Sequence, residues 1–253
     1  MTKNKVVLIT GGAGRIGSSL CRAILESGGR VIISDKDSSR GKALEEELST
    51  SEAVFLESDT TNIQSIDALI SKSEEIFNEP INCSVHCAYP KPINWGKKFE
   101  ELSEIDLNES LSMQLGSAII FSQKIIEYFV KNGGGNLIHI SSIQGICPPK
   151  FEHYEGTDMY SPIEYSAIKA GVIAITTWLA KRYKNSNIRV NCISPGGIKD
   201  NQDEIFLRNY RKSCNNKGLL DSEDISGLAL FLISDDSLFI NGQNLIIDDG
   251  WSL

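Results

Sequence analysis

No apolar stretch of the 253-residue sequence approaches the length of about 18 residues that a membrane-spanning helix needs. The apolar run at 6–9 is too short for a signal peptide, and no cleavage site follows it. We therefore expect no membrane partner and a cytoplasmic location.

Positive charge is also scarce, because 25 Lys and Arg stand against 33 Asp and Glu, a formal net charge of −8. This balance argues against nucleic acid as a partner. The three histidines are scattered and the six cysteines show no paired spacing, so we expect no metal site. With 41% hydrophobic and 23% charged residues, the composition is typical of one α/β domain covering 1–253.

Short apolar runs alternate with segments of helical periodicity along the whole chain. This alternation is typical of βαβ units and predicts an α/β protein. We expect a three-layer, doubly wound Rossmann fold with a seven-stranded parallel sheet. The expected strands are 6–10, 30–34, 53–56, 82–88, 137–142, 188–193 and 244–247. The expected helices are 18–26, 38–50, 62–77, 103–131, 161–183 and 221–234.

Three glycines, Gly11, Gly14 and Gly17, lie between the first expected strand and the first expected helix. Glycines at such a turn allow the backbone to approach a phosphate and the helix to pack against the strand. The start of the helix then offers free N–H groups and a positive dipole to a pyrophosphate. The pattern predicts a dinucleotide-binding site.

Asp35 ends the second expected strand, about 20 residues after the glycine turn. A carboxylate there can accept hydrogen bonds from the adenosine ribose and would repel a 2′-phosphate, which favours NAD over NADP. Lys36 and Arg40 lie close enough in sequence to keep NADP open. A helix N-cap or turn role for Asp35 is the alternative.

Tyr165 and Lys169 are four residues apart in an expected helix and therefore project from one face. An ammonium group near a phenol stabilises the phenolate, so we expect Lys169 to lower the pKa of Tyr165. A phenol of lowered pKa can exchange a proton with a substrate hydroxyl or carbonyl. Ser142 ends the fifth expected strand, where such sheets place their ligands, and could donate to a developing alkoxide. Taken alone, the spacing also fits an ordinary surface helix, and the serine an ordinary turn.

The motifs together resemble those of the short-chain dehydrogenases/reductases (SDRs), and the resemblance covers the whole chain. The motifs are Thr10-Gly-Gly-Ala-Gly-Arg-Ile-Gly17, Asp59, Ser142, Tyr165-x-x-x-Lys169 and Asn191-x-x-x-Pro195-Gly196. The resemblance implies hydride transfer between NAD(P) and a carbonyl or secondary alcohol. In it, Tyr165 is the acid/base, Ser142 the oxyanion donor and Lys169 the ribose contact.

The same resemblance implies the residues that hold the cofactor and the state of assembly. Family members usually form dimers or tetramers, so we expect a homo-oligomer built through the long helix and the last helix–strand pair. The implied cofactor residues are Gly11, Gly14, Arg15, Ile16, Gly17, Asp35, Asp59, Thr60, Cys87, Ala88, Tyr165, Lys169, Pro195, Gly196 and Ile198.

Two positions depart from the family pattern. The usual Asn-Asn-Ala-Gly is here His86-Cys-Ala-Tyr89, which puts a large side chain near the nicotinamide or the substrate entrance. Gln114 takes the place of an asparagine that holds a water in the family's proton relay. Gln114 either holds that water with its longer side chain or changes the proton relay. The departures motivate an alternative, a cofactor-binding sensor or assembly subunit that no longer catalyses. In a third interpretation the protein is an enzyme that catalyses an epimerisation or dehydration, and the redox step is one part of that reaction.

Substrate recognition is expected from a loop at 146–163 and a flap at 198–217. The loop is rich in aromatic and hydrogen-bonding side chains, and long loops of this kind are usually functional. It predicts a polar substrate such as a sugar, unless the loop is a surface excursion. Tyr154-Glu-Gly-Thr157, with the motifs above, resembles the bacterial flagellin-modification oxidoreductases, associated with nonulosonic sugars. That resemblance implies a sugar or nucleotide-sugar of surface-glycan biosynthesis.

Overall fold

The computed structural model describes residues 2–253, which form a seven-stranded sheet in the order β3-β2-β1-β4-β5-β6-β7. Every pairing of neighbouring strands is parallel. The doubly wound fold predicted from the sequence is therefore confirmed. The strands are β1 (Val6–Thr10), β2 (Arg30–Asp35), β3 (Ala53–Glu57), β4 (Cys83–His86), β5 (Gly135–Ile140), β6 (Ile188–Pro195) and β7 (Asn244–Ile247).

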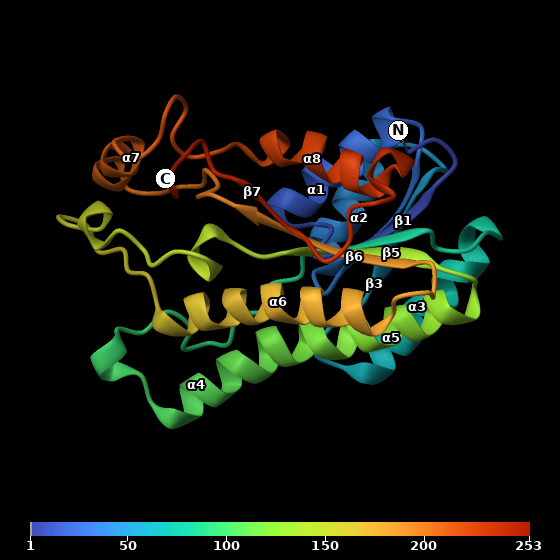
Figure 1. Ribbon diagram of the computed structural model, residues 1–253, viewed down its shortest axis with the longest axis horizontal. Helices are drawn as coiled ribbons and strands as arrows, with labels where there is room; N and C mark the ends of the chain where they lie inside the picture. Colours follow the sequence, from blue (N-terminus) through green and yellow to red (C-terminus); the bar gives the residue numbers. More distant parts are fainter. Residues whose placement is uncertain (1) are drawn as a thin grey trace.

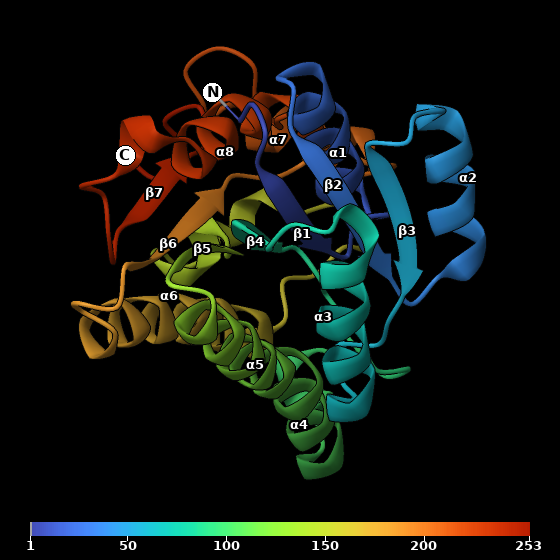
Figure 2. The same cartoon turned by 90° about the vertical axis from the view of Figure 1, so that its right-hand side faces the viewer.

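Helices cover both faces of the sheet, as Figures 1 and 2 show. Because successive side chains of a strand point to opposite faces, each strand contributes to two cores. Val7 and Ile9 pack under one helical layer, and Val6 and Leu8 under the other. The first layer contains α1 (Arg15–Glu26), α2 (Ser38–Leu48) and α8 (Ser226–Ile233). The second contains α3 (Ile63–Phe77), α5 (Ser117–Lys131) and α6 (Ile163–Arg182).

The long helix expected at 103–131 consists of three segments. α4 (Glu104–Ser110) continues through a π-helical turn, Leu111–Gly116, into α5. Such turns occur frequently at functional sites, and this one contains Gln114. The remaining elements are α7 (Glu204–Arg211) and five 3₁₀ turns, Phe99–Glu101, Ile143–Gly145, Phe151–His153, Ser222–Ile225 and Asp235–Ser237.

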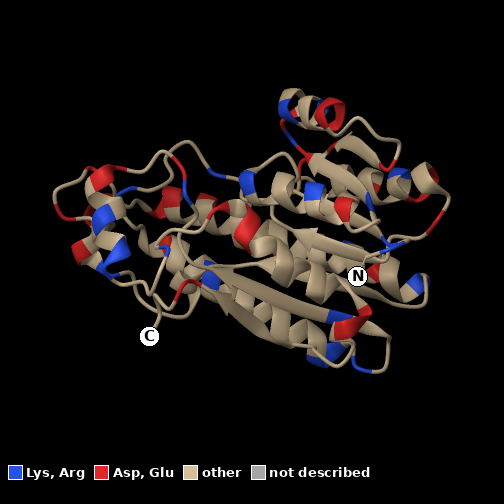
Figure 3. Cartoon of the chain, turned by 90° about the horizontal axis from the view of Figure 1, so that it is seen from above, with Lys and Arg blue, Asp and Glu red and all other residues tan. Residues whose placement is uncertain are grey.

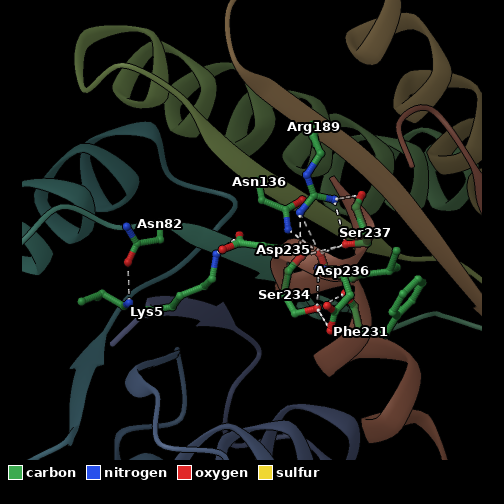
Figure 4. Close-up of polar contacts among 11 residues, drawn as sticks. Lys5, Asn82, Asn136, Arg189, Phe231, Ser234, Asp235, Asp236 and Ser237 are labelled. Atoms are coloured by element: carbon green, nitrogen blue, oxygen red, sulfur yellow. Dashed lines mark hydrogen bonds and ion pairs between the residues drawn. The ribbon is translucent and has the colours of Figure 1, made fainter. Parts of the chain in front are cut away.

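A polar network closes the amino ends of the central strands (Figure 4). Arg189 of β6 donates hydrogen bonds of 3.0 Å to the carbonyl oxygens of Leu232 and Ser237, and Asn136 of β5 donates to Leu232 at 2.7 Å. A cation at the end of α8 also suits the negative end of the helix dipole. This end of the sheet is filled by structural contacts, which leaves the carboxyl ends for ligands.

Acidic and basic residues are interspersed over the helices and loops around the sheet, while the strands carry few (Figure 3). Within residues 2–253, no helix combines the length and the apolar character required to cross a lipid bilayer.

Candidate active site

The glycine turn after β1 is held in a geometry that side chains would disrupt. Gly11 has a φ of 66°, and a Cβ there would lie 2.7 Å from the backbone nitrogen of Ala88. A Cβ on Gly17 would lie 2.2 Å from the carbonyl oxygen of Gly11. Since ordinary van der Waals contacts are wider, the turn requires glycine at both positions. It brings the start of α1 to the gap between β1 and β4, where the strand order reverses.

A cleft of about 320 Å³ opens at this point. Its walls include eleven of the residues predicted to bind the cofactor: Gly11, Gly14, Arg15, Ile16, Gly17, Asp35, Asp59, Thr60, Cys87, Ala88 and Ile198. Lys36, Ser58, Tyr89 and Pro90 line it as well and were not among the predicted cofactor residues. Lys36, Ser58 and Tyr89 adjoin predicted residues in sequence, which is the signal that could have found them, and Pro90 follows one residue later.

Two carboxylates are fixed at the rim of the cleft by backbone amides. Asp35 accepts hydrogen bonds from the amides of Ala13 and Asp37, both at 3.1 Å, which hold its side chain at the end of β2. Asp59 accepts from the amide of Thr61 at 2.8 Å. A glycine cradle at a helix start, with a carboxylate at the end of the next strand, fits a dinucleotide. The residues present therefore suit NAD.

Ser142, Tyr165 and Lys169 line a second cavity, of about 510 Å³. The Ser142 hydroxyl accepts a hydrogen bond from the amide of Gln144 at 3.2 Å, so Ser142 caps the turn that follows β5. Lys169 lies one helical turn after Tyr165 on α6, and its ammonium group donates to the carbonyl oxygen of Ile140 at 3.1 Å. The structure thus brings together the three residues that the sequence placed on one strand end and one helix.

Burial raises the pKa of Tyr165, and a hydrogen bond with the Ser142 side chain partly offsets this rise. We predicted that Lys169 would lower the pKa of Tyr165. That prediction was wrong, because this pKa is raised above its ordinary value. The Lys169 ammonium lies over the face of the Tyr165 ring, 5.7 Å from its centroid. Burial lowers the pKa of Lys169 itself to about 8. Desolvation of the phenolate outweighs any attraction from this position.

Tyr89 lies where the two cavities meet and lines both of them. Its ring packs edge-to-face on Tyr165, with ring centroids 5.8 Å apart, and the Lys169 ammonium lies 5.1 Å from its centroid. Trp95 packs on Tyr89 and Tyr165 at 5.7 and 6.3 Å. Sequence reasoning missed Trp95, whose signal is its position in the loop directly after β4. The substitution of Tyr89 for the family glycine thus builds an aromatic wall beside Tyr165.

Gln114 and Glu164 are buried beside this wall, at 5% and 1% exposure. Within residues 2–253, neither the Gln114 amide nor the Glu164 carboxylate reaches a hydrogen-bond partner in the protein. Burial raises the pKa of the Tyr89 phenol, the Glu164 carboxylate raises it further, and the nearby Gln114 amide lowers it. Sequence reasoning missed Glu164, because glutamate in a helix is mostly solvent-facing.

The loop and the flap meet over the second cavity. His153, Tyr154 and Tyr160 of the loop line it, as do Asp200, Gln202, Phe206 and Tyr210 of the flap. Tyr154 packs on Phe206 with ring centroids 5.1 Å apart, which joins loop to flap. Ser161 donates to the Gln144 side chain at 2.6 Å. Pro195, at the end of β6, and Gly196 and Ile198, which follow it, also line the cavity. The cavity therefore presents aromatic surfaces and hydrogen-bonding groups together.

The two buried histidines of the sheet are structural. Burial lowers the pKa of His86 to about 3 and that of His139 to about 4, so both are neutral near pH 7. The His86 ring pairs with the Thr10 hydroxyl at 2.8 Å, and His139 pairs with Ser122 at 2.9 Å. His86 thus replaces the family asparagine as a link between β4 and β1.

A dinucleotide cleft that opens into a serine–tyrosine–lysine cavity at the switch point of a parallel sheet defines an NAD(P)-dependent oxidoreductase. Residues 11–252 match the family model described as "Enoyl-(Acyl carrier protein) reductase". The chain belongs to the short-chain dehydrogenase/reductase family.

Three relatives place the chain within this family. It is 44% identical to "Post-translational flagellin modification protein A" of Campylobacter coli, over 100% of both chains. It is 33% identical to the L-fucose dehydrogenase of Oryctolagus cuniculus, over 98% of this chain and 85% of that one. A short-chain dehydrogenase of Leptospira borgpetersenii with bound NAD+ is similar with a TM-score of 0.88 and 30% identity, over 100% of this chain and 94% of that one.

Asp35→Ala should reduce the preference for NADH over NADPH. Losing the carboxylate removes both its repulsion of a 2′-phosphate and its hydrogen bonds to the ribose. Hydrogen bonds to charged groups contribute about 1.5–3 kcal/mol, so the ratio of dissociation constants should fall by about tenfold or more. Fluorescence titration with NADH and NADPH measures this ratio.

The matched control is Asp37→Ala. Asp37 caps α2 by accepting from the Arg40 amide at 3.0 Å, and it does not line the cleft. Its loss should cost about 1 kcal/mol of stability and leave the cofactor preference unchanged. A wild-type protein that already prefers NADPH would contradict the role given to Asp35.

Proposed function

We propose that the protein transfers hydride between NAD(P) and a carbonyl or secondary alcohol of a sugar or nucleotide-sugar in bacterial surface-glycan biosynthesis. The observation that carries the proposal is the cavity next to Tyr165, in which Trp95 and Tyr154 offer flat surfaces and Gln144 and Ser161 offer polar groups. Aromatic faces and hydrogen-bonding groups together suit a sugar, which has apolar C–H faces and hydroxyl edges. The names of the flagellin-modification and L-fucose dehydrogenase relatives support the same class.

In this proposal the chain positions the substrate oxygen and moves its proton. Tyr165 exchanges the proton with that oxygen, and Ser142 donates a hydrogen bond to it as charge develops. Lys169 orients the nicotinamide ribose. Gln114, buried beside Tyr89, is the proposed remaining member of the proton relay. Bound NAD(P) supplies the redox chemistry.

We also propose that the protein forms a dimer or tetramer. Apolar side chains on the outer faces of two helices support it, because large exposed patches mark interaction surfaces. Ile119 of α5 is 46% exposed and Trp178 of α6 is 63% exposed. Light scattering tests this proposal, and a monomer at micromolar concentration would contradict it.

A substrate screen tests the proposed activity. The NAD-loaded protein is offered free sugars, sugar phosphates and nucleotide-sugars, with an aliphatic alcohol and a hydroxysteroid as controls, and NADH formation is followed. We expect turnover with at least one sugar and little with either control. Turnover of a control alone would contradict the substrate class.

The alternative function is a cofactor-binding sensor or assembly subunit. It is favoured by one observation: at the position of the family's relay asparagine, Gln114 is buried and its side-chain amide has no hydrogen-bond partner within residues 2–253. Tight NADH binding without oxidation or reduction of any sugar would support this alternative. Product formation without net change in NADH would instead indicate a redox step within an epimerisation or dehydration.

A further inference from the structure

Four charged side chains line the cavity beside Tyr165, and three of them are already engaged. Arg15 forms an ion pair with Asp200, and Lys169 donates to the carbonyl oxygen of Ile140. Lys91 is the fourth. Among residues 2–253, no carboxylate pairs with it, and its ammonium group lies over the ring of Tyr89, 5.2 Å from the centroid. Within residues 2–253, Lys91 is therefore the cation of this cavity that has neither a carboxylate nor a carbonyl oxygen as a partner.

The position of Lys91 is on the substrate side of the site. Pro90 lines only the cofactor cleft, whereas Lys91, the next residue, lines only the second cavity. Lys91 and Tyr165 both lie near the Tyr89 ring, the Lys91 ammonium at 5.2 Å and the Tyr165 ring centroid at 5.8 Å from its centroid. A ligand that reaches Tyr165 with its reacting carbon can therefore reach Lys91 with another part of the same small molecule.

The charge of the whole protein makes this cation informative. A formal net charge of −8 repels anions at long range, so binding an anionic substrate requires a local positive group. The face of an aromatic ring attracts an ammonium ion, which lets the Tyr89 ring hold Lys91 without neutralising it. The charge stays available to a ligand.

We propose that Lys91 binds an oxyanion, a carboxylate or a phosphate, on the sugar while its reacting carbon lies at Tyr165. This inference rests on the proposed function and narrows its substrate class to acidic or phosphorylated sugars. The contact combines charge attraction with a hydrogen bond, and such charge-assisted bonds are about twice as strong as neutral ones. Lys91 is then a specificity-determining residue, because a neutral sugar leaves it unpaired.

Calorimetric titration of the NAD-loaded protein tests the proposal with glucose, glucose 6-phosphate and glucuronate. We expect at least one anionic ligand to bind more tightly than glucose. Lys91→Ala should weaken that binding by about 10- to 100-fold, the range for hydrogen bonds to charged groups, and leave the affinity for glucose unchanged. Lys91→Arg should retain most of the preference. If only glucose 6-phosphate, or only glucuronate, binds more tightly than glucose, the result identifies which oxyanion the site binds.

Lys98→Ala is the matched control, because Lys98 is an exposed lysine of the same loop that does not line the cavity. Its ligand affinities should match those of the wild type. Equal or undetectable binding of all three ligands, or a Lys91→Ala variant that keeps the preference, overturns the proposal. Turnover of neutral sugars without any preference for anions also overturns it and leaves the proposed function standing. An anion preference that Lys91→Ala abolishes, in a protein that turns over no sugar, supports the Lys91 site and contradicts the proposed activity.

Discussion

Tyr165→Phe should lower turnover by at least about 100-fold, since general acid–base groups contribute about 10²–10⁴-fold. The phenylalanine ring keeps the edge-to-face packing on Tyr89 and Trp95, so the cavity should keep its shape. Only the exchangeable proton is lost. NADH affinity should therefore change little, and the measurement is kcat beside the dissociation constant for NADH.

Tyr154→Phe is the matched control for this substitution. Tyr154 also lines the cavity, and its hydroxyl accepts a hydrogen bond of 3.4 Å from Gln144. Its removal should affect KM more than kcat. A wild-type rate in Tyr165→Phe would remove Tyr165 from the mechanism.

The pH profile gives a second readout of the same group. Alcohol oxidation needs the deprotonated phenol, and burial raises the pKa of Tyr165 above its ordinary value. The oxidation rate of the wild type should therefore climb with rising pH through the neutral and mildly alkaline range. Carbonyl reduction, which needs the protonated phenol, should not decline over that range. The Tyr165→Phe variant should lose the pH dependence of oxidation.

Gly17→Ala should weaken NADH binding by at least about 100-fold and destabilise the protein. The new methyl group would lie 2.2 Å from the carbonyl oxygen of Gly11 and 2.7 Å from the Cα of Gly12. Both obstacles are backbone atoms of the turn, so α1 must move away from β1. Overpacking of this kind costs about 1–3 kcal/mol, and it also displaces the amides that face the pyrophosphate.

Gly227→Ala provides the control, because among residues 2–253 the same methyl group on α8 would meet no atom within 4 Å apart from its chain neighbours and the backbone of its own helix. Alanine is a better helix former than glycine, so this variant should be as stable as the wild type or more stable. Thermal melts and NADH titration of both variants make the comparison. Wild-type affinity in Gly17→Ala would show that the turn tolerates a side chain.

The fold and the cofactor cleft were predictable because their signals are local. The alternation of apolar runs and helical segments needs only neighbouring residues, and it predicted all seven strands to within a few residues. The glycine turn is equally local, although the close approach of Gly11 to Ala88 joins distant segments. Asp35 ends β2 as expected and lines the cleft.

The cavity beside Tyr165 was less predictable because it depends on how distant segments meet. Gln144 follows Ser142 closely in sequence, but its bond to Ser161 forms only when the loop folds back. Glu164 carries no sequence signal of burial, since only the packing around α6 removes it from water. The direction of the Tyr165 pKa likewise depends on desolvation, which spacing along a helix cannot reveal.

Arg15, Ile16, Cys87, Tyr89 and Ile198 form a wall common to both cavities. Occupation of either side therefore changes the surroundings of the other. Thermodynamic reciprocity then requires that, if the dinucleotide strengthens or weakens the hold on the second ligand by some factor, the second ligand does the same to the dinucleotide. The affinity for the dinucleotide or for the second ligand, measured without the other, therefore differs from the affinity in the complex that holds both by that same factor.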